Sequence, residues 1–513
     1  MFFKMRKNKF HVVLHIITLL FIVLLFCYFR IKPIYYQTVG YTYDQGRDFL
    51  KVAEMVIYHN PTFIGPTTGI MGVFHGAWWY YLLSIPFFLT GGNPIGFYFF
   101  NFCMQLVSLV AFIFFSKKYF GFLTTSILSF LITTSSFSVF NSIFAVNNAL
   151  ALPAFLFLLM TFVMYFEGQH KITFLKSIQI PMLLLVGLFL GFVAEFEFAF
   201  GLLLIPTFLI LSGIYLFKKI LKINLKEYAF FFTGLVIPFV PRILFEVKNG
   251  FSQTKTLLSF VHNPQYFTPK TYDQIFFDRV AIFNSYFESI FMSDWVKIII
   301  ILCLIICVIY RFYVKDFIFK KSLVFLIILG LALFIISTFY KDTFWSYYYE
   351  GIQYLFILIF GYILTFKKRK DHIILIIKSI TLAALLILGL GKLISEFRQQ
   401  PIYDGIQVQN DIVEYIQSHS ETNQENYCVK VYTPPVIPYT YNYLFLYNKI
   451  SQNIPEPSDS WAENSTCWLI VEYDENNERK QLWIDNTIPL DAGKIVEHQI
   501  KDVDIYYYSN TKK

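Results

Sequence analysis

The chain has 513 residues, of which 56% are hydrophobic and 15% carry a charge, and its mean hydropathy is +0.54. Soluble domains carry about 25% charged residues, so this composition excludes an ordinary soluble protein and indicates a polytopic membrane protein. The net charge of +8 is unevenly divided, because the residues after Ser395 hold 9 Lys/Arg against 18 Asp/Glu. Such asymmetry is typical of membrane topology and does not indicate binding to nucleic acid.

The basic clusters predict the topology, because cytoplasmic loops carry an excess of Lys and Arg. The run KMRKNK at residues 4–9 places the N-terminus in the cytoplasm, so the first span, about 11–29, leads out. About eleven spans bring every later basic cluster inside, which predicts an α-helical polytopic membrane protein. The other ten spans cover about 95–115, 121–140, 146–166, 178–194, 198–217 and 228–246, three stretches that end near Arg311, Lys341 and Lys367, and about 372–394.

A polar external loop, about 30–94, follows the first span. It carries several ionisable side chains, namely Asp44, Arg47, Asp48, Glu54 and His75. If the stretch is helical, Asp44 and Asp48 share a face with Arg47 beside them. The apolar segment 78–89 is short, so we predict a juxtamembrane helix in the outer interface, where its Trp and Tyr side chains suit the headgroup zone.

Further ionisable residues fall at or just beyond the outer ends of the predicted spans: Glu195, Glu197, Arg242, Glu246, Lys341 and Glu350. Ionisable groups at membrane depth are costly and indicate a functional site. A carboxylate could act as a general base on a hydroxyl, and Arg or Lys could hold a phosphate by charge-assisted hydrogen bonds. A cavity lined by such groups suits a substrate with a phosphate head and a lipid tail.

Residues 395–513 predict a small extracytoplasmic α/β domain after a membrane domain of residues 1–394. A helical pattern covers Gly405–Ser418, and PYTYNYLFLYNKI predicts an aromatic amphipathic helix. Strand patterns lie in YCVKVYT, CWLIVEYD, KIVEHQI and DIYYYS. Cys428 and Cys467 of this domain either form a disulfide or remain free thiols, and the sequence favours neither.

Motifs for nucleotide or zinc chemistry are absent from the sequence. It contains no Cys-x-x-Cys, no His/Cys spacing for zinc, no phosphate-binding Gly-x-x-x-x-Gly-Lys loop and no Gly-x-Ser-x-Gly elbow. We therefore expect no cofactor, although Asp44 and Asp48 with a Glu could hold a hard divalent cation.

Three features in chain order resemble one known family: Asp44-Gln45 at the opening of the external loop, His75 before an aromatic juxtamembrane helix, and Lys-Lys-Tyr-Phe-Gly at 117–121. They resemble the GT-C glycosyltransferases of the protein O-mannosyltransferase and aminoarabinose-transferase branch. Those enzymes move a sugar from a polyprenyl-phosphate carrier to an acceptor on the outer face of the membrane. The resemblance implies the same fold and reaction class here.

The resemblance also assigns residues. The family's acidic catalytic residue corresponds to Asp44, and Gln45 stands where the family commonly has Glu. His75-Gly76-Ala77-Trp78 replaces the family's His-Pro-Pro-Leu. Glu195-Phe196-Glu197 stands where relatives often have Gln-x-His, and Tyr347-Tyr348 resembles a His-Tyr or Tyr-Tyr pair before a late span.

The resulting hypothesis is a membrane glycosyltransferase with an extracytoplasmic active site. Asp44 would act as general base on a glycan, lipid or protein acceptor, whose oxygen displaces the carrier phosphate with inversion. Arg242, with Lys248 or Lys341, would hold that phosphate. The supporting residues would be Arg47, Asp48, His75, Glu195, Glu197, Tyr347 and Tyr348.

Structural alternatives remain open for several of these residues. Asp48 could pair with Arg47 or Lys51, and Arg242 could pair with Glu246 one helical turn away. A polysaccharide polymerase or ligase is an alternative function, but such proteins usually rely on large external loops rich in Arg and His. A transporter of lipid-linked glycans is another, although the sequence shows no inverted repeat.

Overall fold

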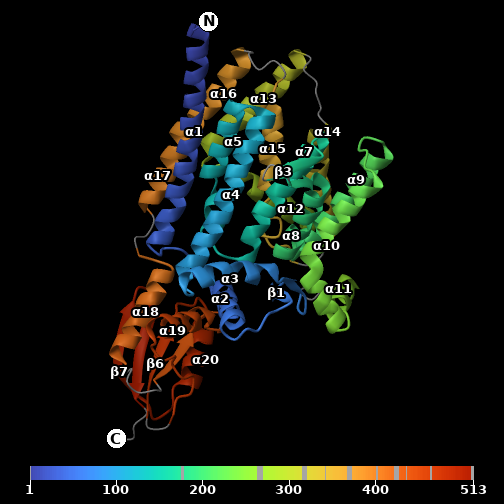
Figure 1. The fold of residues 1–513 in the computed structure, drawn as a ribbon. Coiled ribbons are helices and arrows are strands. Elements are labelled where there is room, and N and C mark those ends of the chain that lie inside the picture. The colour runs from blue at the N-terminus through green and yellow to red at the C-terminus, as the bar shows by residue number, and fades with distance from the viewer. Residues whose placement is uncertain are drawn as a thin grey trace. The chain divides into compact units, whose positions relative to one another are not determined.

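The computed structural model describes residues 2–174, 178–262, 270–314, 321–340, 343–366, 372–399, 403–420, 427–434, 436–462 and 465–509. The chain divides into two compact units, each assembled from separate segments (Figure 1). The first unit comprises Met1–Ile31, Thr62–Trp79 and Asn101–Gln400. The second comprises Lys32–Pro61, Tyr80–Phe100 and Pro401–Lys513, so the C-terminal residues are grouped with parts of the first loop.

Apolar helices build most of the first unit. They are α1 (Phe2–Tyr35), α4 (Pro94–Phe120), α5 (Phe122–Thr134), α6 (Ser136–Ser142), α7 (Ala151–Phe166), α8 (Met182–Phe196), α9 (Phe198–Phe217), α10 (Leu225–Lys248), α13 (Asp294–Tyr313), α14 (Lys321–Ser337), α15 (Gln353–Leu364) and α16 (His372–Ala384). A 3-10 turn, η1 (Asn147–Leu150), precedes α7, and a π-helical turn, η2 (Leu385–Gly389), joins α16 to α17 (Leu390–Gln399). Their lengths and composition make the chain an integral membrane protein.

Each predicted span coincides with one apolar helix or bent pair. Seven of the described helices are long and apolar enough to cross a membrane, and an eighth is added if α5 and α6 form one bent span. The remaining three predicted spans fall on the shorter apolar helices α8, α14 and α15. The fold class is therefore confirmed, whereas the number of crossings and the orientation of the termini stay predictions.

The bend between α5 and α6 is a local example of how polar groups are accommodated among these helices. The two helices meet at 58°. The buried guanidinium of Arg30, on α1, donates hydrogen bonds to the Thr133 carbonyl at 3.0 Å, Ser138 Oγ at 3.1 Å and Ser142 Oγ at 3.3 Å. A buried charge is tolerated only with such partners, so the bend and the arginine support each other.

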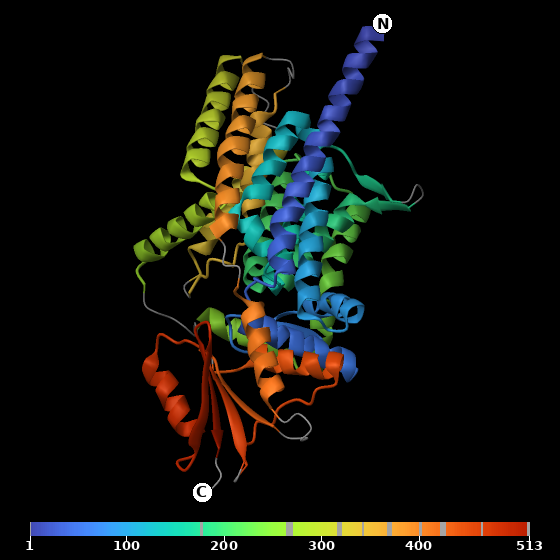
Figure 2. The same cartoon turned by 90° about the vertical axis from the view of Figure 1, so that its left-hand side faces the viewer.

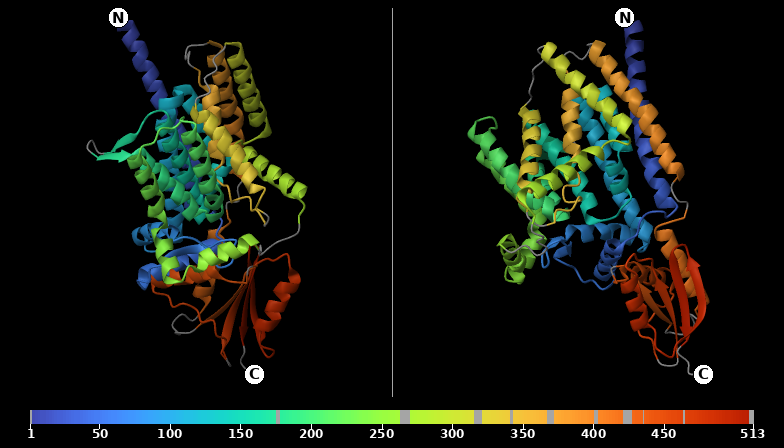
Figure 3. Two further views of the ribbon diagram at one scale, coloured as in Figure 1. Left: turned by 90° about the vertical axis from the view of Figure 1, so that its right-hand side faces the viewer. Right: turned by 180° about the vertical axis from the view of Figure 1, so that it is seen from behind.

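Several shorter elements of the first unit were not predicted. They are α11 (Ser252–His262), α12 (Tyr272–Glu288), β1 (Ile64–Thr67) with β2 (Phe74–Gly76), and β3 (Lys171–Phe174) with β4 (Ile178–Pro181). Both strand pairs are antiparallel, and the β3–β4 hairpin projects from the helices in Figure 3. The sequence prediction treated residues 247–294 as one long loop, because α11 is short and mostly polar and α12 mixes apolar with charged residues.

The second unit contains a four-stranded sheet. Its strands are β5 (Cys428–Tyr432), β6 (Thr466–Val471), β7 (Gly493–Ile500) and β8 (Val503–Ser509), in the order β5-β6-β8-β7. β5 and β6 run parallel, and the other neighbours are antiparallel. Its helices are α2 (Tyr43–Ile57), most of α3 (Trp78–Thr90), α18 (Ile406–His419), α19 (Tyr439–Gln452) and α20 (Asn477–Thr487).

Side chains along β6 alternate between the two faces of the sheet, and helices cover both faces (Figure 2). Leu469 and Val471 face α20 and pack with Trp483 and Ile484 of that helix. Trp468 points the other way and meets the ring of Tyr415 on α18 at 5.9 Å. The strands and two helices predicted for this domain are confirmed, but α20 was missed because its sequence, NERKQLWIDNT, is mostly polar.

Two further contacts fix this unit. Cys428 and Cys467 form a disulfide between the parallel strands β5 and β6, which settles the question that the sequence left open. Helix α2 of the first loop packs on α19, and Gly46 lies so close to α19 that an added Cβ would be 2.5 Å from the Thr440 nitrogen. Only a residue without a side chain allows this approach, so the C-terminal residues position α2.

Candidate functional site

The first candidate site lies at the start of α2. Thr42, whose backbone is extended, precedes the helix. Its backbone N–H donates a hydrogen bond to Gln45 Oε1 at 2.8 Å. This is half of a capping box, so Gln45, which stands where the family commonly has Glu, keeps the role of helix cap. Its Nε2 donates to Tyr98 Oη at 2.9 Å. The cap places Asp44 in the first turn, where the helix dipole favours a negative charge.

Four side chains, here called the Asp44 cluster, surround this turn: Asp44, Arg47, Asp48 and Tyr80. Arg47 contacts Asp44 Oδ1 and Asp48 Oδ1, each at 2.8 Å, and Tyr80 donates to Asp48 Oδ1 at 3.2 Å. The Asp48 side chain is completely buried, whereas that of Asp44 is 58% exposed. One carboxylate is therefore enclosed by its partners while the other faces outward.

Burial and charge act in opposite directions on Arg47. Burial alone would lower the pKa of Arg47, but the neighbouring Asp48 and Asp44 carboxylates raise the pKa above its usual value. Burial, reinforced by the charge of Asp48, also raises the pKa of Tyr80 well above its usual value. Arg47 therefore stays charged and Tyr80 stays a neutral donor beside the buried Asp48 carboxylate.

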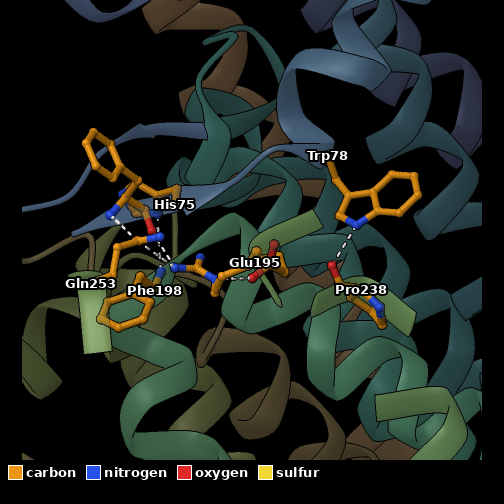
Figure 4. Close-up of polar contacts among 8 residues, drawn as sticks. His75, Trp78, Glu195, Phe198, Pro238 and Gln253 are labelled. Carbon is orange, nitrogen blue, oxygen red and sulfur yellow. Dashed lines mark hydrogen bonds and ion pairs between the residues drawn. The ribbon is translucent and has the colours of Figure 1, made fainter. Parts of the chain in front are cut away.

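The second candidate site, here called the Glu195 cluster, consists of His75, Glu195, Arg242 and Gln253 (Figure 4). It belongs to the first compact unit, whereas the Asp44 cluster belongs to the second. Arg242 Nε donates to Glu195 Oε1 at 2.7 Å, and the Glu195 side chain is completely buried. The structure thus joins Glu195 of α8 to Arg242 of α10, two residues that the sequence had only placed near the same membrane face.

The backbone of β2 links Arg242 to Gln253. Arg242 Nη1 donates to the Phe74 carbonyl at 2.8 Å and to Gln253 Oε1 at 3.2 Å. The same Gln253 oxygen accepts the Phe74 N–H at 2.9 Å. Three buried atoms of these side chains have no hydrogen-bond partner within the described ranges: Glu195 Oε2, Arg242 Nη2 and Gln253 Nε2.

His75 and Glu197 fix the start of α9. His75 Nδ1 accepts the Phe198 N–H at 3.2 Å, so a neutral ring carries its proton on Nε2. Glu197 Oε1 accepts the Ala199 N–H at 3.3 Å. Burial raises the pKa of Glu197 to about 8, although that hydrogen bond opposes the shift. Both residues therefore act first as helix caps, and Glu197 is a carboxyl group poised to hold a proton near neutral pH.

Glu246 does not pair with Arg242, the residue one helical turn away. Its carboxylate accepts the Gln253 N–H and the Thr254 N–H, each at 3.0 Å, and the Thr254 hydroxyl at 2.6 Å. Arg242 is paired with Glu195 instead. Glu246 thus anchors the start of α11 and thereby holds Gln253 beside Arg242.

The other predicted site residues are placed less centrally. Lys248 is exposed at the end of α10, and Lys341 lies outside the described residues. Tyr348 is buried and Tyr347 partly exposed before α15. Burial raises the pKa of Tyr348 above its usual value, and an added Cβ on Gly69 would lie 2.6 Å from its hydroxyl.

A nearby group, Glu350, is half-buried and accepts hydrogen bonds from Gln353 Nε2 at 3.0 Å and Asn141 Nδ2 at 3.2 Å. Burial raises the pKa of Glu350 to about 7. In the part of the chain that the structure describes, no group of three or more His, Cys, Asp or Glu side chains could hold a metal ion.

Sequence reasoning missed Gln253 and Tyr80 as members of the two clusters. Gln253 is 179 residues from Phe74, which it contacts, and nothing in the local sequence marks it. Tyr80 was assigned to an interfacial aromatic belt with its neighbours. One signal could have indicated Tyr80. If α2 is helical, Asp48 faces the following helix, and a buried carboxylate there needs a hydrogen-bond donor.

No family model matches the chain, and no curated protein matches its sequence. Among solved structures, ArnT from Cupriavidus metallidurans in the apo state is similar with a TM-score of 0.60 and 11% identity, over 98% of this chain and 98% of that chain. The same protein bound to undecaprenyl phosphate has a TM-score of 0.57 and 11% identity, over 97% of each chain.

A third similar structure is the archaeal oligosaccharyltransferase AglB from Archaeoglobus fulgidus in complex with an inhibitory peptide and a dolichol-phosphate. Its TM-score is 0.50 with 11% identity, over 97% of this chain and 74% of that chain. The protein therefore has the GT-C fold, as the sequence resemblance predicted. The similarity extends from the first helix into the C-terminal residues.

Proposed function

We propose that this protein is a membrane glycosyltransferase that moves a sugar from a polyprenyl-phosphate carrier to an acceptor on the outer face of the membrane. The GT-C fold supports the reaction class. Two of the similar structures hold polyprenyl-type phosphates, undecaprenyl phosphate in one and dolichol-phosphate in the other. A carrier of that chemistry fits a chain whose site residues follow apolar, lipid-facing helices.

The position of Asp44 carries the proposal. Its carboxylate is at the start of α2 and is 58% exposed, while Arg47 holds it from one side at 2.8 Å. Helix capping and the contact of Gly46 with α19 fix the backbone on which it sits. A general base must be reachable by its substrate and held in place, and Asp44 meets both requirements.

In the proposed reaction, the acceptor hydroxyl gives its proton to the Asp44 carboxylate as its oxygen attacks the anomeric carbon. The bond from that carbon to the phosphate oxygen breaks, and the polyprenyl phosphate leaves with the electron pair. Attack opposite to the leaving group inverts the anomeric configuration. Arg47 holds the Asp44 carboxylate from one side by an ion pair at 2.8 Å.

The test is the Asp44→Asn variant in cells that lack the wild-type gene. Removing a general base lowers a rate by about 10²–10⁴-fold. We therefore expect the lipid-linked sugar that accumulates in the deletion strain to accumulate equally with Asp44→Asn, as measured by mass spectrometry of extracted lipids. Membrane levels of the variant must match those of the wild type.

The chain offers a matched control in Asp294→Asn. Asp294 also lies in the first turn of a helix and pairs with a basic residue three positions on, Lys297, at 2.8 Å. It should complement the deletion as well as the wild type does. Full complementation by Asp44→Asn would remove Asp44 from the mechanism, and a deletion strain with unchanged lipid-linked sugars would contradict the proposed function itself.

A further inference from the structure

The β3–β4 hairpin separates apolar from polar side chains. Its antiparallel register pairs Ile172 with Ile180 and Thr173 with Gln179. Directly paired residues share one face of a sheet, and successive residues along a strand alternate between the two faces. Ile172, Ile178 and Ile180 therefore share one face, whereas Thr173 and Gln179 lie on the other.

A side-chain contact supports this division of the two faces. Lys171, two positions before Thr173 in β3, donates from Nζ to Gln179 Oε1 at 3.1 Å. Lys171 is exposed, so the polar face of the hairpin carries a solvated cation. Among the side chains that the structure describes, the opposite face presents only isoleucine.

The hairpin projects from the helices of the first compact unit (Figures 2 and 3). None of the side chains described for residues 171–173 and 178–181 is buried, and Ile178 is 53% exposed. A strand rises about 3.4 Å per residue, so a four-residue strand extends about 14 Å. A two-stranded hairpin is at best marginally stable in water, so its apolar face requires a surface to pack against.

Polar contacts hold the base of the hairpin at the ends of the apolar helices. The His170 carbonyl accepts the Met182 N–H at 2.9 Å, and His170 Nδ1 lies 3.2 Å from Glu227 Oε1 in the first turn of α10. Gln169 accepts a hydrogen bond from Lys118 at the end of α4. The hairpin therefore starts at the boundary of the membrane, and the basic clusters predict that this boundary is the cytoplasmic one.

The position of the hairpin favours lipid as the surface that covers its apolar face. β3 follows α7, and β4 leads directly into α8, so both strands are tied to apolar helices that a bilayer surrounds. Amphipathic helices at a membrane surface bury their apolar face about 5–10 Å into the boundary between headgroups and acyl chains, with basic residues on the polar face. The hairpin has the same division of apolar and basic faces.

The backbone of the hairpin limits how deep it can lie. A two-stranded sheet has unpaired N–H and C=O groups along both outer edges, and such groups are not tolerated in contact with hydrocarbon. Headgroups and interfacial water can supply the missing hydrogen bonds. The interface therefore suits the hairpin, whereas the hydrocarbon core does not.

We infer that the β3–β4 hairpin is a membrane-surface anchor in the cytoplasmic leaflet. Ile172, Ile178 and Ile180 contact lipid, while Lys171 and Gln179 face headgroups and water. Because Pro181 ends β4 and Met182 begins α8, the anchor fixes the depth of α8 in the bilayer. This role is separate from the proposed transfer reaction.

The test is electron paramagnetic resonance of the whole protein in nanodiscs of phosphatidylcholine and phosphatidylglycerol. Single nitroxide labels are attached through Ile178→Cys and Gln179→Cys, adjacent positions on opposite faces. The background retains the disulfide and has alanine at the four free cysteines, Cys27, Cys103, Cys303 and Cys307. Collisions with oxygen report exposure to lipid, and collisions with a water-soluble nickel chelate report exposure to water.

We expect the label at 178 to favour oxygen and to lie about 5–10 Å into the boundary of headgroups and acyl chains. The label at 179 should favour the nickel chelate. Two reference labels calibrate the scale: Ile305→Cys, 48% exposed on the apolar helix α13, for lipid, and the fully exposed Leu490→Cys for water.

A second measurement keeps the test decisive if the cysteine-free background folds poorly. A benzophenone amino acid at 178 or 179, in the otherwise unchanged protein, should form a lipid adduct from 178 and none from 179, as detected by mass spectrometry. Equal access of the nickel chelate to both labels would overturn the inference. So would a label at 178 that is shielded from both reagents, or a cross-link from 178 to protein, since the face would then pack on a partner or a second copy.

Discussion

The Asp44 cluster and the Glu195 cluster both contain an ion pair between an arginine and a buried carboxylate. They differ in whether the buried atoms of that pair all have hydrogen-bond partners. Each holds an arginine against a buried carboxylate, Arg47 with Asp48 and Arg242 with Glu195. In the first cluster a tyrosine completes the shell, and the spare capacity lies on the exposed Asp44. In the second, both members of the ion pair keep one unpartnered buried atom among the described residues.

The difference shows how two similar ion pairs can serve different purposes. A pair whose hydrogen bonds are complete supports the fold and fixes a neighbouring group, here the reactive carboxylate of Asp44. A pair that also bonds to the backbone of another element holds distant segments together, as Arg242 does through the Phe74 carbonyl. On this account the first cluster presents a base, and the second joins α8, β2, α10 and the start of α11.

The largest effect should come from removing the cation of the first cluster. Arg47→Met removes the cation that pairs with the buried Asp48 carboxylate, and breaking a buried ion pair in this way costs about 3–5 kcal/mol. We expect a large fall in the thermal unfolding temperature of the purified protein. Glu195→Gln should cost much less, because the amide oxygen still accepts from Arg242. Equal losses in the two variants would contradict the distinction.

The pH dependence of stability should sharpen the contrast through Glu197. Burial raises the pKa of Glu197 to about 8, well above the value near 4.5 expected in the unfolded chain. The folded state therefore binds the extra proton, and stability falls as the pH rises from about 4.5 to about 8, by a few kcal/mol. Tyr286 and Tyr348 lie within electrostatic reach of this carboxyl group.

Glu197→Gln removes the titration and should flatten that profile. Thermal unfolding between pH 5 and pH 8 measures it, with the exposed Glu288→Gln as the control that keeps the wild-type slope. Glu350, whose pKa burial raises to about 7, adds to the wild-type slope and persists in both variants. A profile in Glu197→Gln as steep as that of the wild type would show that Glu197 titrates normally.

A smaller effect is expected where α2 meets α19. Gly46→Ala places a Cβ 2.5 Å from the Thr440 nitrogen, and this backbone contact yields only if the helices separate, at about 1–3 kcal/mol. The transfer rate per folded molecule should also fall, by more than the loss of folded protein explains, because α2 carries Asp44. Gly213→Ala in α9 is the control, since its Cβ would meet nothing within 4 Å and alanine favours a helix by about 1 kcal/mol.

Much of the fold was predictable because its signals are local. Apolar runs predicted the apolar helices of the first unit, and strand-like runs predicted β5, β6, β7 and β8. Even Asp44 and Arg47 could be expected to pair, since they are three residues apart on a helix. The boundary between domains of residues 1–394 and 395–513 stays a prediction.

The rest depended on contacts between distant segments. Arg242 had a carboxylate one turn away at Glu246, yet it pairs with Glu195, which is 47 positions earlier in the chain. Glu246 is occupied by the start of α11, a helix too short and polar to predict. Sequence spacing reveals which partners are within reach, but packing decides which of them is used.

The most direct test of the account compares Asp44→Asn with Asp48→Asn, two isosteric changes on the same arginine. Both transfer rate per folded molecule and thermal unfolding temperature should be measured. We predict that Asp44→Asn lowers transfer by about 10²-fold or more with little change in stability. Asp48→Asn should lower stability while the folded protein keeps most of its transfer activity. The reverse pattern, with transfer lost through Asp48 and preserved in Asp44→Asn, would contradict the account.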